Sequence, residues 1–378
     1  MSIVSKMISL TDEITSLGCM LSIGIVGLPN VGKSTLFNAL TGSNILAANY
    51  PFATIEPNTG IVAVPDNRLN KLAKLHKTNN VIPASVTFVD IAGLVAGASN
   101  GEGLGNQFLS HIRNVNAIVQ VVRAFDDPNV AHVDSEYNPQ KDIDIINTEL
   151  VLADLQSISK QIARLERETK ANPKLKPTLE LIKKAEGYLN EGIPLWSHPE
   201  MDQDALSDLQ LLTTKSIIYL FNLDEKDLNN ESKKKDLAEM VAPAKASFTC
   251  AKLENELKDL DEQDAIELLK SYGQDESSLI QLIHISYELL NYQSYLTAGE
   301  KEVRAWTIKK GCTAKQAAGV IHKDFELGFI AAEIVSYQDL IEYGSFNKAK
   351  SNGKVRTEGK DYIMQPNDVV LFRFNVSK

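Results

Sequence analysis

An eight-residue stretch, GLPNVGKS, constrains the fold of this chain more than any other feature of its sequence. It spans Gly27–Ser34 and fits the pattern G-x-x-x-x-G-K-[ST]. The apolar run Leu21–Val26 before it is typical of a buried strand, and Lys33–Gly42 after it is typical of a helix. This context favours a phosphate-binding loop over a purely structural glycine turn. We therefore expect Lys33 to neutralise phosphate oxygens and the Ser34 hydroxyl to ligate Mg²⁺.

Three further apolar, β-branched runs follow this loop along the chain. They are Ser85–Asp90, Ala117–Val122 and Ser216–Phe221. Stretches with helical patterns separate them. Strands that alternate with helices form mainly parallel sheets, so the predicted fold class is α/β.

A charged segment with helical periodicity interrupts this alternation. Its apolar residues recur at helical spacing: Ile143, Ile146, Leu150, Ile158, Ile162 and Leu165. The stretch ANPKLKP then turns the chain before a second helical run, Thr178–Asn190. The pattern predicts an antiparallel helical hairpin that projects from the sheet domain, and an ordinary packed helix pair is the alternative.

The C-terminal part of the chain has a different pattern. A Leu- and Ile-rich helix is expected from Ser277 to about Tyr292, and from Glu302 strands, a short helix and turns follow, ending with Asp368–Val376. This pattern predicts a small appended domain of the ubiquitin type. Residues 301–378 carry 13 Lys and Arg against 9 Asp and Glu, a net charge of +4, whereas the whole chain has −10. A basic module on an acidic body indicates a localised anionic partner, although a solvated surface alone could produce the same balance.

Composition excludes several classes of protein. Hydrophobic residues make up 43% of the 378 residues, which is enough for a large core. Cys19, Cys250 and Cys312 are far apart and lack metal-ligand spacing, so we expect neither disulfides nor zinc, and a reducing cytoplasm fits best. No apolar run approaches the roughly 18 residues of a membrane span. The net charge of −10 argues against general nucleic-acid binding, so no DNA partner is expected.

A second phosphate signature ends the run Ser85–Asp90. In the stretch DIAGL, Asp90 is placed to hold Mg²⁺ through water, and the Gly93 N–H can turn toward a γ-phosphate. The glycine-rich stretch GASNGEGLGNQF that follows is typical of a segment that senses this phosphate. The residue after Gly93 is Leu94, which cannot orient a water molecule, so another residue must hold the attacking water or hydrolysis must be slow.

The stretch IIYLFNLDEKD resembles the base-reading corner of a nucleotide site. In proteins that bind guanine, the Asn at this position is usually followed by Lys, any residue and Asp. Here Asn222 is followed by Leu223, Asp224 and Glu225. Guanine presents two donors that a carboxylate accepts as a pair, but adenine presents an amino donor beside the N1 acceptor, which would repel a carboxylate. The altered corner favours adenine, read by Asn222 or by backbone near Cys250. A decayed guanine site without preference is the alternative.

Taken together, these motifs make the chain resemble the Obg-like ATPase (YchF) family, in the Obg branch of P-loop GTPases. The resemblance rests on GLPNVGKS, YPFATIEPNTG, DIAGLVAGASNGEGLGNQFL, NLDE, YLTAGEKEVRAWTI, HKDFELGFIAAE and GKDYIMQPNDVV. It implies a G-domain interrupted by a coiled-coil hairpin, a C-terminal TGS (ubiquitin-like) domain, a preference for ATP over GTP, and association with ribosomes. The expected domains are an N-terminal extension at 1–20, a G-domain at 21–138 and 205–292, a helical hairpin at 139–204 and a TGS domain at 293–378.

The resemblance also assigns roles to individual residues. Thr54 matches the threonine that reaches Mg²⁺ when a triphosphate is bound, with Thr59 as the alternative, and Asn30 matches an asparagine that helps to hold K⁺. Gln120 occupies a strand position where relatives often carry a His that is a candidate for positioning water, and His111, on the helix after the glycine-rich stretch, is the alternative. The remaining expected nucleotide contacts lie in or directly after the phosphate loop: Val31, Gly32 and Thr35.

These observations lead to one hypothesis about function. We expect a monomeric cytoplasmic P-loop ATPase that acts as a nucleotide-dependent switch, transfers a phosphoryl group to water with Mg²⁺, and meets the ribosome through its TGS and helical domains. One alternative is a nucleotide-gated ribosome- or RNA-binding module in which turnover is incidental. A GTPase of relaxed base specificity is another. A metabolic kinase is a third, weaker alternative, because the sequence shows no segment that would form a lid over an acceptor substrate.

Overall fold

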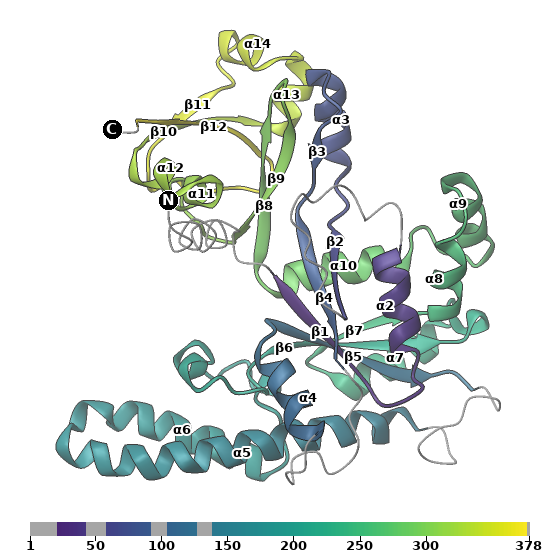
Figure 1. Ribbon diagram of the computed structural model, residues 1–378, viewed down its shortest axis with the longest axis vertical. Coiled ribbons are helices and arrows are strands. Elements are labelled where there is room, and N and C mark those ends of the chain that lie inside the picture. Colours follow the sequence, from purple (N-terminus) through teal and green to yellow (C-terminus); the bar gives the residue numbers. More distant parts are fainter. Residues whose placement is uncertain (1–20, 43–57, 92–103, 127–137, 376–378) are drawn as a thin grey trace, which may run out of the picture.

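The structure is a computed structural model that describes residues 21–42, 58–91, 104–126 and 138–375. Its described part contains two six-stranded sheets and a long helical hairpin (Figure 1). The hairpin and the C-terminal sheet extend from the same central sheet in different directions (Figure 1). The predicted sites Thr54, Gly93 and Leu94 lie outside the described residues.

The central sheet has the strand order β2-β4-β1-β5-β6-β7. All neighbouring strands run parallel except β2, which pairs antiparallel with β4. The strands are β1 (Ser22–Val26), β2 (Thr59–Ala63), β4 (Ser85–Asp90), β5 (Ala117–Ala124), β6 (Ser216–Leu223) and β7 (Lys245–Thr249). The apolar runs are therefore central strands of a mainly parallel sheet, as predicted, and such strands read as continuous apolar stretches because both their faces are covered.

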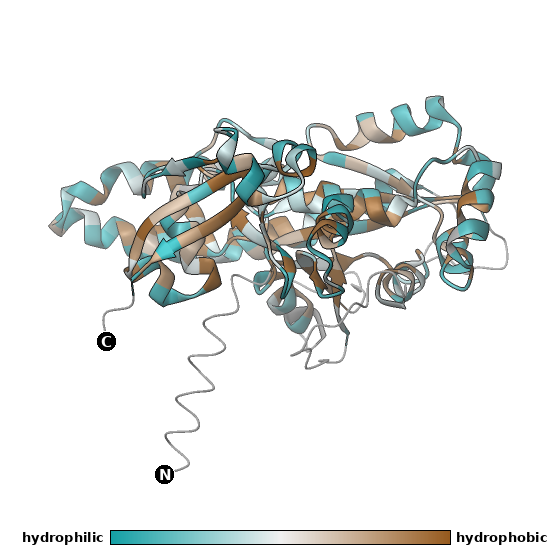
Figure 2. Cartoon of the chain, turned by 90° about the horizontal axis from the view of Figure 1, so that it is seen from above, coloured by the Kyte–Doolittle hydropathy of each residue, from teal (hydrophilic) through white to brown (hydrophobic). Residues whose placement is uncertain are grey.

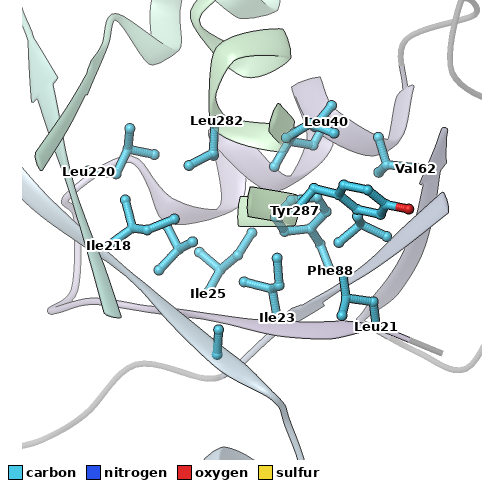
Figure 3. Packing of buried hydrophobic residues seen from close by; sticks show 14 of the residues in the cluster. Leu21, Ile23, Ile25, Leu40, Val62, Phe88, Ile218, Leu220, Leu282 and Tyr287 are labelled. Atoms are coloured by element: carbon cyan, nitrogen blue, oxygen red, sulfur yellow. The ribbon is translucent and has the colours of Figure 1, made fainter. Parts of the chain in front are cut away.

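Helices pack on this sheet and bury its apolar side chains. Figure 3 shows Leu40 and Leu282 on the same side of the strands that carry Ile23, Ile25 and Ile218, and all five residues are at most 1% exposed. The helices of this region, with one 3₁₀ turn, are α2 (Lys33–Gly42), α3 (Asn67–His76), α4 (Leu104–Arg113), η5 (Glu225–Asp227), α7 (Glu231–Val241), α8 (Ala251–Leu257), α9 (Glu262–Ser271) and α10 (Ser278–Leu289).

The hairpin consists of α5 and α6, joined by a 3₁₀ turn. Asn138 caps α5 by accepting a hydrogen bond from Lys141 N, and Pro139 occupies the first turn, where its missing N–H costs nothing. The first turns of α5 bury Ile143 and Ile146 in the core of the sheet domain, so the hairpin grows out of that core. Its elements are α5 (Pro139–Ala171), η2 (Pro173–Leu175) and α6 (Lys176–Asn190), and the 3₁₀ turns η3 (Leu195–Ser197) and η4 (Asp204–Leu209) follow it.

Beyond that root, the two hairpin helices bury a separate apolar seam between them. The seam includes Ile158, Ile162, Ile182 and Leu189, which are all 9% exposed or less. The outer faces of the hairpin carry mostly hydrophilic residues, whereas hydrophobic residues concentrate along the strands at the centre of the molecule (Figure 2). An apolar stripe on an otherwise charged helix pair is what the sequence periodicity predicts.

The C-terminal sheet has the strand order β11-β10-β12-β8-β9-β3. Its sixth strand comes from a much earlier part of the chain: β3 (Val81–Ile82), which lies between β2 and β4 in the sequence, pairs parallel with β9. The other elements are β8 (Tyr292–Ala298), β9 (Val303–Lys309), α11 (Ala314–Ile321), α12 (Lys323–Leu327), β10 (Phe329–Ser336), α13 (Tyr337–Tyr343), α14 (Phe346–Ser351), β11 (Arg356–Glu358) and β12 (Asp368–Phe374). The assignment of this unit to the TGS class stays a prediction.

Side-chain contacts also join the two sheets. The Arg68 Nη1 group on α3 donates to the carbonyl oxygen of Pro366 at 2.6 Å and to Asn367 Oδ1 at 2.9 Å. Asp66 holds the same guanidinium through Nε and Nη2, at 2.9 Å and 2.7 Å. The C-terminal sheet is therefore docked on the α3–β3 segment. Among the helices of the described residues, none combines the length and the apolar character that crossing a membrane requires.

Candidate nucleotide-binding site

The phosphate loop lies at the carboxyl end of β1, directly before α2. Two of its residues have left-handed backbones, Asn30 with φ 62° and Gly32 with φ 95°. A Cβ atom at Gly32 would meet Asn222 Nδ2, so a larger residue does not fit there. The first intrahelical hydrogen bond runs from Leu36 N to Gly32 O at 2.9 Å. The N–H groups of the first turn therefore have no partner within the helix and can face an anion, as a phosphate loop requires.

The side chain of Lys33 reaches across to the end of β4. Its Nζ donates to the carbonyl oxygen of Ile91 at 2.7 Å and lies 3.0 Å from Asp90 Oδ1. The contact with Asp90 is an ion pair without the alignment of a hydrogen bond. The two charged side chains are only 11% and 16% exposed. A triphosphate bound in the loop would compete with Asp90 for this cation, because both are anions.

The residues present fit a magnesium ion that shares its ligands with a nucleotide. Ser34 is exposed at the first turn of α2, and Thr35 beside it is also exposed. Within the described part of the chain, no group of three or more His, Cys, Asp or Glu side chains could hold a metal ion by itself. Mg²⁺ usually takes one or two protein ligands together with phosphate oxygens and waters, so Ser34 and Asp90 suit that arrangement.

Asn222 is the central residue of the predicted base corner. Its Nδ2 group donates to the carbonyl oxygen of Val31 at 3.0 Å, and its Oδ1 accepts from Ala251 N at 2.9 Å. The side chain is 5% exposed. The sequence predicts that Asn222 contacts the base. In the structure its side chain links the phosphate loop to the start of α8. One lone pair of Oδ1 remains available to accept from an adenine amino group.

The other residues of the corner also differ from their expected roles. Leu223 ends β6 and belongs to the core, at 2% exposure. Cys250 precedes α8, is 4% exposed, and makes no capping bond with its side chain. Burial raises the pKa of its thiol, so the side chain stays neutral.

Glu225 lies in η5, where two residues that the sequence did not single out hold it. Its Oε1 lies 2.9 Å from Lys252 Nζ, and its Oε2 accepts from the Tyr272 hydroxyl at 3.1 Å. The hydrogen bond with Lys252 lowers the pKa of Glu225 and raises that of Lys252. The position of Lys252 two residues after Cys250 is a signal that could have identified it, but no local pattern points to Tyr272.

The two candidates for positioning water have different surroundings. Gln120 on β5 pairs with Val26, the last residue of β1, so it lies beside the root of the phosphate loop. It is 1% exposed, and its Oε1 has no hydrogen-bond partner among the described residues. A role for Gln120 in catalysis stays a prediction.

The structure places the alternative, His111, away from the phosphate loop. It is an exposed residue in the last turn of α4, close to the start of β5. At that point Asn116 N donates to the oxygen of Ser22, the first residue of β1, at 2.8 Å. The phosphate loop follows the last residue of β1, so the end of α4 that carries His111 lies near the opposite, amino-terminal ends of the strands.

Comparisons with known proteins agree with this architecture. A family model described as a 50S ribosome-binding GTPase matches residues 22–184, and a model named YchF-GTPase_C, described as a protein of unknown function, matches residues 292–375. A protein of Pasteurella multocida named ribosome-binding ATPase YchF is 49% identical, over 93% of this chain and 99% of its own length. The Bacillus subtilis protein of the same name is 48% identical, over 94% of this chain and 100% of its own.

A solved structure also matches nearly the whole chain. The structure of the Schizosaccharomyces pombe YchF GTPase has a TM-score of 0.83 and 42% identity, and the match covers 93% of this chain and 97% of that one. The predicted family and the predicted P-loop α/β fold are both confirmed. On the identity and coverage of these relatives, the chain belongs to the YchF family.

Proposed function

We propose that this protein is an ATP-hydrolysing switch that works with Mg²⁺ and associates with the ribosome. The observation that carries the proposal is the meeting of Lys33 and Asp90, 3.0 Å apart, at the mouth of a phosphate loop. The names of the bacterial relatives, which call them ribosome-binding ATPases, support the choice of nucleotide and partner.

The chemistry follows from the groups at the loop. Lys33 neutralises charge on the transferring phosphoryl group, and the backbone N–H groups of Gly32, Lys33 and Ser34 hold the phosphates in place. When bound, Mg²⁺ supplies charge stabilisation to the phosphate oxygens, held by Ser34 and, through water, by Asp90. Thr54 and the Gly93 N–H are further proposed contacts. Asn30, exposed on the loop, is the proposed contact for K⁺.

The position of the attacking water determines the rate. Leu94 cannot orient a water molecule, and Gln120 is buried beside the loop rather than open to it. We therefore expect slow turnover by the isolated protein, about 10⁻⁴ to 10⁻² s⁻¹, the range of unassisted P-loop hydrolases. Ribosomes are expected to raise this rate by completing the site.

The ribosome contact is assigned to the C-terminal sheet and the hairpin. The net charge of +4 on residues 301–378, against −14 on the rest, fits a polyanionic partner. The cytoplasm is the proposed compartment and the monomer the proposed state. Binding to purified ribosomes is expected to weaken steeply as salt rises, because phosphate contacts release counterions.

One experiment tests activity and partner together. Phosphate release from ATP and from GTP is followed with and without ribosomes, with Lys33→Ala as the inactive reference. The proposal expects ATP turnover that ribosomes stimulate and that Lys33→Ala abolishes. ATP turnover that is fast without ribosomes, or that the Lys33→Ala variant retains, contradicts it.

The description of the S. pombe relative as a GTPase supports one competing function, a hydrolase of relaxed base specificity. The same measurement separates the two proposals. Equal turnover of ATP and GTP would favour the relaxed hydrolase, whereas a clear preference for ATP would exclude it.

A further inference from the structure

The choice between ATP and GTP depends on Glu225, the carboxylate three residues after Asn222. Proteins that bind guanine have an aspartate at this position. The side chain of Glu225 is 28% exposed. A free carboxylate at this position has two oxygens that can accept from the N1–H and 2-amino groups of guanine. Whether Glu225 can do so depends on what already occupies those oxygens.

Both oxygens are engaged, each by a different part of the chain. Lys252, on the first turn of α8, places Nζ 2.9 Å from Oε1. Tyr272, just after α9, donates its hydroxyl to Oε2 at 3.1 Å. Three segments that are distant in sequence thus meet at one carboxylate, and the two contacts fix its plane and compensate its charge. We call Glu225, Lys252 and Tyr272 the carboxylate clamp.

The position of Tyr272 is itself fixed by the loop that carries it. Asn229 Nδ2 donates to the Tyr272 carbonyl oxygen at 2.7 Å, and Gln274 Nε2 donates to Asn229 Oδ1 at 2.9 Å. Gly273 adopts φ 66°, and a Cβ atom there would lie 2.6 Å from Asn229 Nδ2. These hydrogen bonds join the turn after η5 to the end of α9 and so hold Tyr272 beside Glu225. The ring packs with Leu228, Cys250 and Leu253.

We propose that Lys252 and Tyr272 are positioning residues that determine base specificity, because they keep the Glu225 carboxylate from accepting the two donors of guanine. The inference rests on the proposed preference for ATP and supplies its cause. Each oxygen of Glu225 keeps a second lone pair, but the two contacts fix the plane of the carboxylate and compensate its charge. Guanine would have to reorient this carboxylate and so break one or both contacts of the clamp, whereas adenine needs no such change. The clamp also compensates a negative charge that would repel the N1 lone pair of adenine.

The exposure of the two partners sets the size of the effect. Lys252 is 73% exposed, so its ion pair alone contributes little. Tyr272 is half-buried, so its hydroxyl hydrogen bond of 3.1 Å is better shielded from water than the ion pair. Removal of both contacts is therefore expected to change specificity more than either single change.

Calorimetric titration of ADP and GDP in the presence of Mg²⁺ tests the clamp, since diphosphates exclude turnover. The variants are Lys252→Met, Tyr272→Phe and their combination, with Lys252→Arg as the conservative exchange. Lys235→Met is the matched control, because Lys235 is 77% exposed and pairs with Glu239 on α7 at 3.8 Å. The double variant is expected to gain about 5- to 30-fold in GDP affinity, the size of one or two freed hydrogen bonds, with ADP affinity changed less than about threefold. Lys252→Arg and Lys235→Met are expected to keep the wild-type ratio.

A triple variant that adds Glu225→Ala shows whether the gain acts through the carboxylate. The proposal expects the gain to vanish in it. An unchanged ratio in the double variant, or a gain that survives Glu225→Ala, overturns the proposal. If the double variant fails to fold, Tyr272→Phe alone carries the test, because it removes only one hydroxyl, and a ratio shifted toward GDP remains the expected result. Equal binding of ADP and GDP by the wild type would instead refute the proposed preference for adenine, which separates the two failures.

Discussion

The side-chain amide of Asn222 donates a hydrogen bond of 3.0 Å to the backbone carbonyl of Val31 and so ties the base corner to the phosphate loop. The same side chain accepts from Ala251 N, at the start of α8. The phosphate loop and the proposed base corner are therefore joined through one buried side chain. A pattern comparison assigns the residue to the base, but its contacts assign it first to the loop.

Asn222→Ala is expected to weaken ADP and GDP binding alike, by about 5- to 150-fold, because two buried hydrogen bonds worth about 1–3 kcal/mol are lost. Calorimetric titration of both nucleotides measures the effect. A loss confined to one nucleotide would show that the residue reads the base directly.

Asp90→Asn is expected to lower nucleotide affinity about 10- to 100-fold in Mg²⁺, since an amide is a poorer partner for the waters of a metal ion. With a chelator in place of Mg²⁺, affinity is expected to match or exceed that of the wild type, because a negative charge beside the phosphates has been removed. Asp208→Asn, on an exposed side chain, serves as the control. A loss of equal size with and without Mg²⁺ would contradict the role of Asp90 in holding the ion.

Arg68→Met is expected to destabilise the docking of the C-terminal sheet. Arg68 is 25% exposed and donates to Pro366 and Asn367 across the junction, and hydrogen bonds from charged groups contribute about 1.5–3 kcal/mol. The midpoint of thermal unfolding measures the loss. Arg164→Met, at 65% exposure in an i,i+4 pair with Glu168, is the control and is expected to change little. Equal midpoints for the two variants would show that the junction contributes nothing.

Glu333→Gln is expected to remove part of the acid sensitivity of the C-terminal sheet. Lys350 lies 2.6 Å from Glu333 Oε1 and Arg373 Nη2 lies 2.7 Å from Oε2, and these hydrogen bonds lower the pKa of Glu333 below its ordinary value of 4.5. A lowered folded-state pKa contributes stability above the unfolded value of 4.5, and that contribution is lost as the pH falls through the folded value.

The wild type is therefore expected to exceed Glu333→Gln in stability by roughly 1 kcal/mol at pH 7, since both cations are half exposed. Denaturant titrations from pH 7 to pH 3 measure the difference, with Glu168→Gln as an exposed control. The difference is expected to shrink below pH 4.5. A difference that stays constant with pH would exclude the ion pairs as its cause.

The parts of this molecule that sequence reasoning predicted are those set by local pattern. The loop Gly27–Ser34 and the strand ending at Asp90 follow from short-range periodicity and glycine chemistry, and each lies where it was expected. The two-residue strand Val81–Ile82 did not follow, because the partner of Val81, Val303, comes from a distant part of the chain. A two-residue run has no periodicity to detect.

The parts of the site that were missed depend on contacts across the fold. Tyr272 meets Glu225 from 47 residues away, and nothing near it in the sequence marks it as a partner of Glu225. The position of His111 could not be predicted, because a helical pattern does not reveal at which end of the strands the helix terminates. Asn222 stays a predicted site residue, and its hydrogen-bond partners, Val31 and Ala251, could not be predicted because they depend on how α8 lies against the loop.

The central claim, that this corner selects adenine, is tested most directly by the affinity of the wild-type protein for ATP and for GTP, both as non-hydrolysable analogues, in Mg²⁺. The phosphate loop binds the two nucleotides alike, so a difference arises only from the corner around Asn222 and Glu225. The account predicts binding of the ATP analogue about 5- to 150-fold tighter, the value of one or two paired polar contacts. Equal affinities, or tighter binding of the GTP analogue, would contradict it.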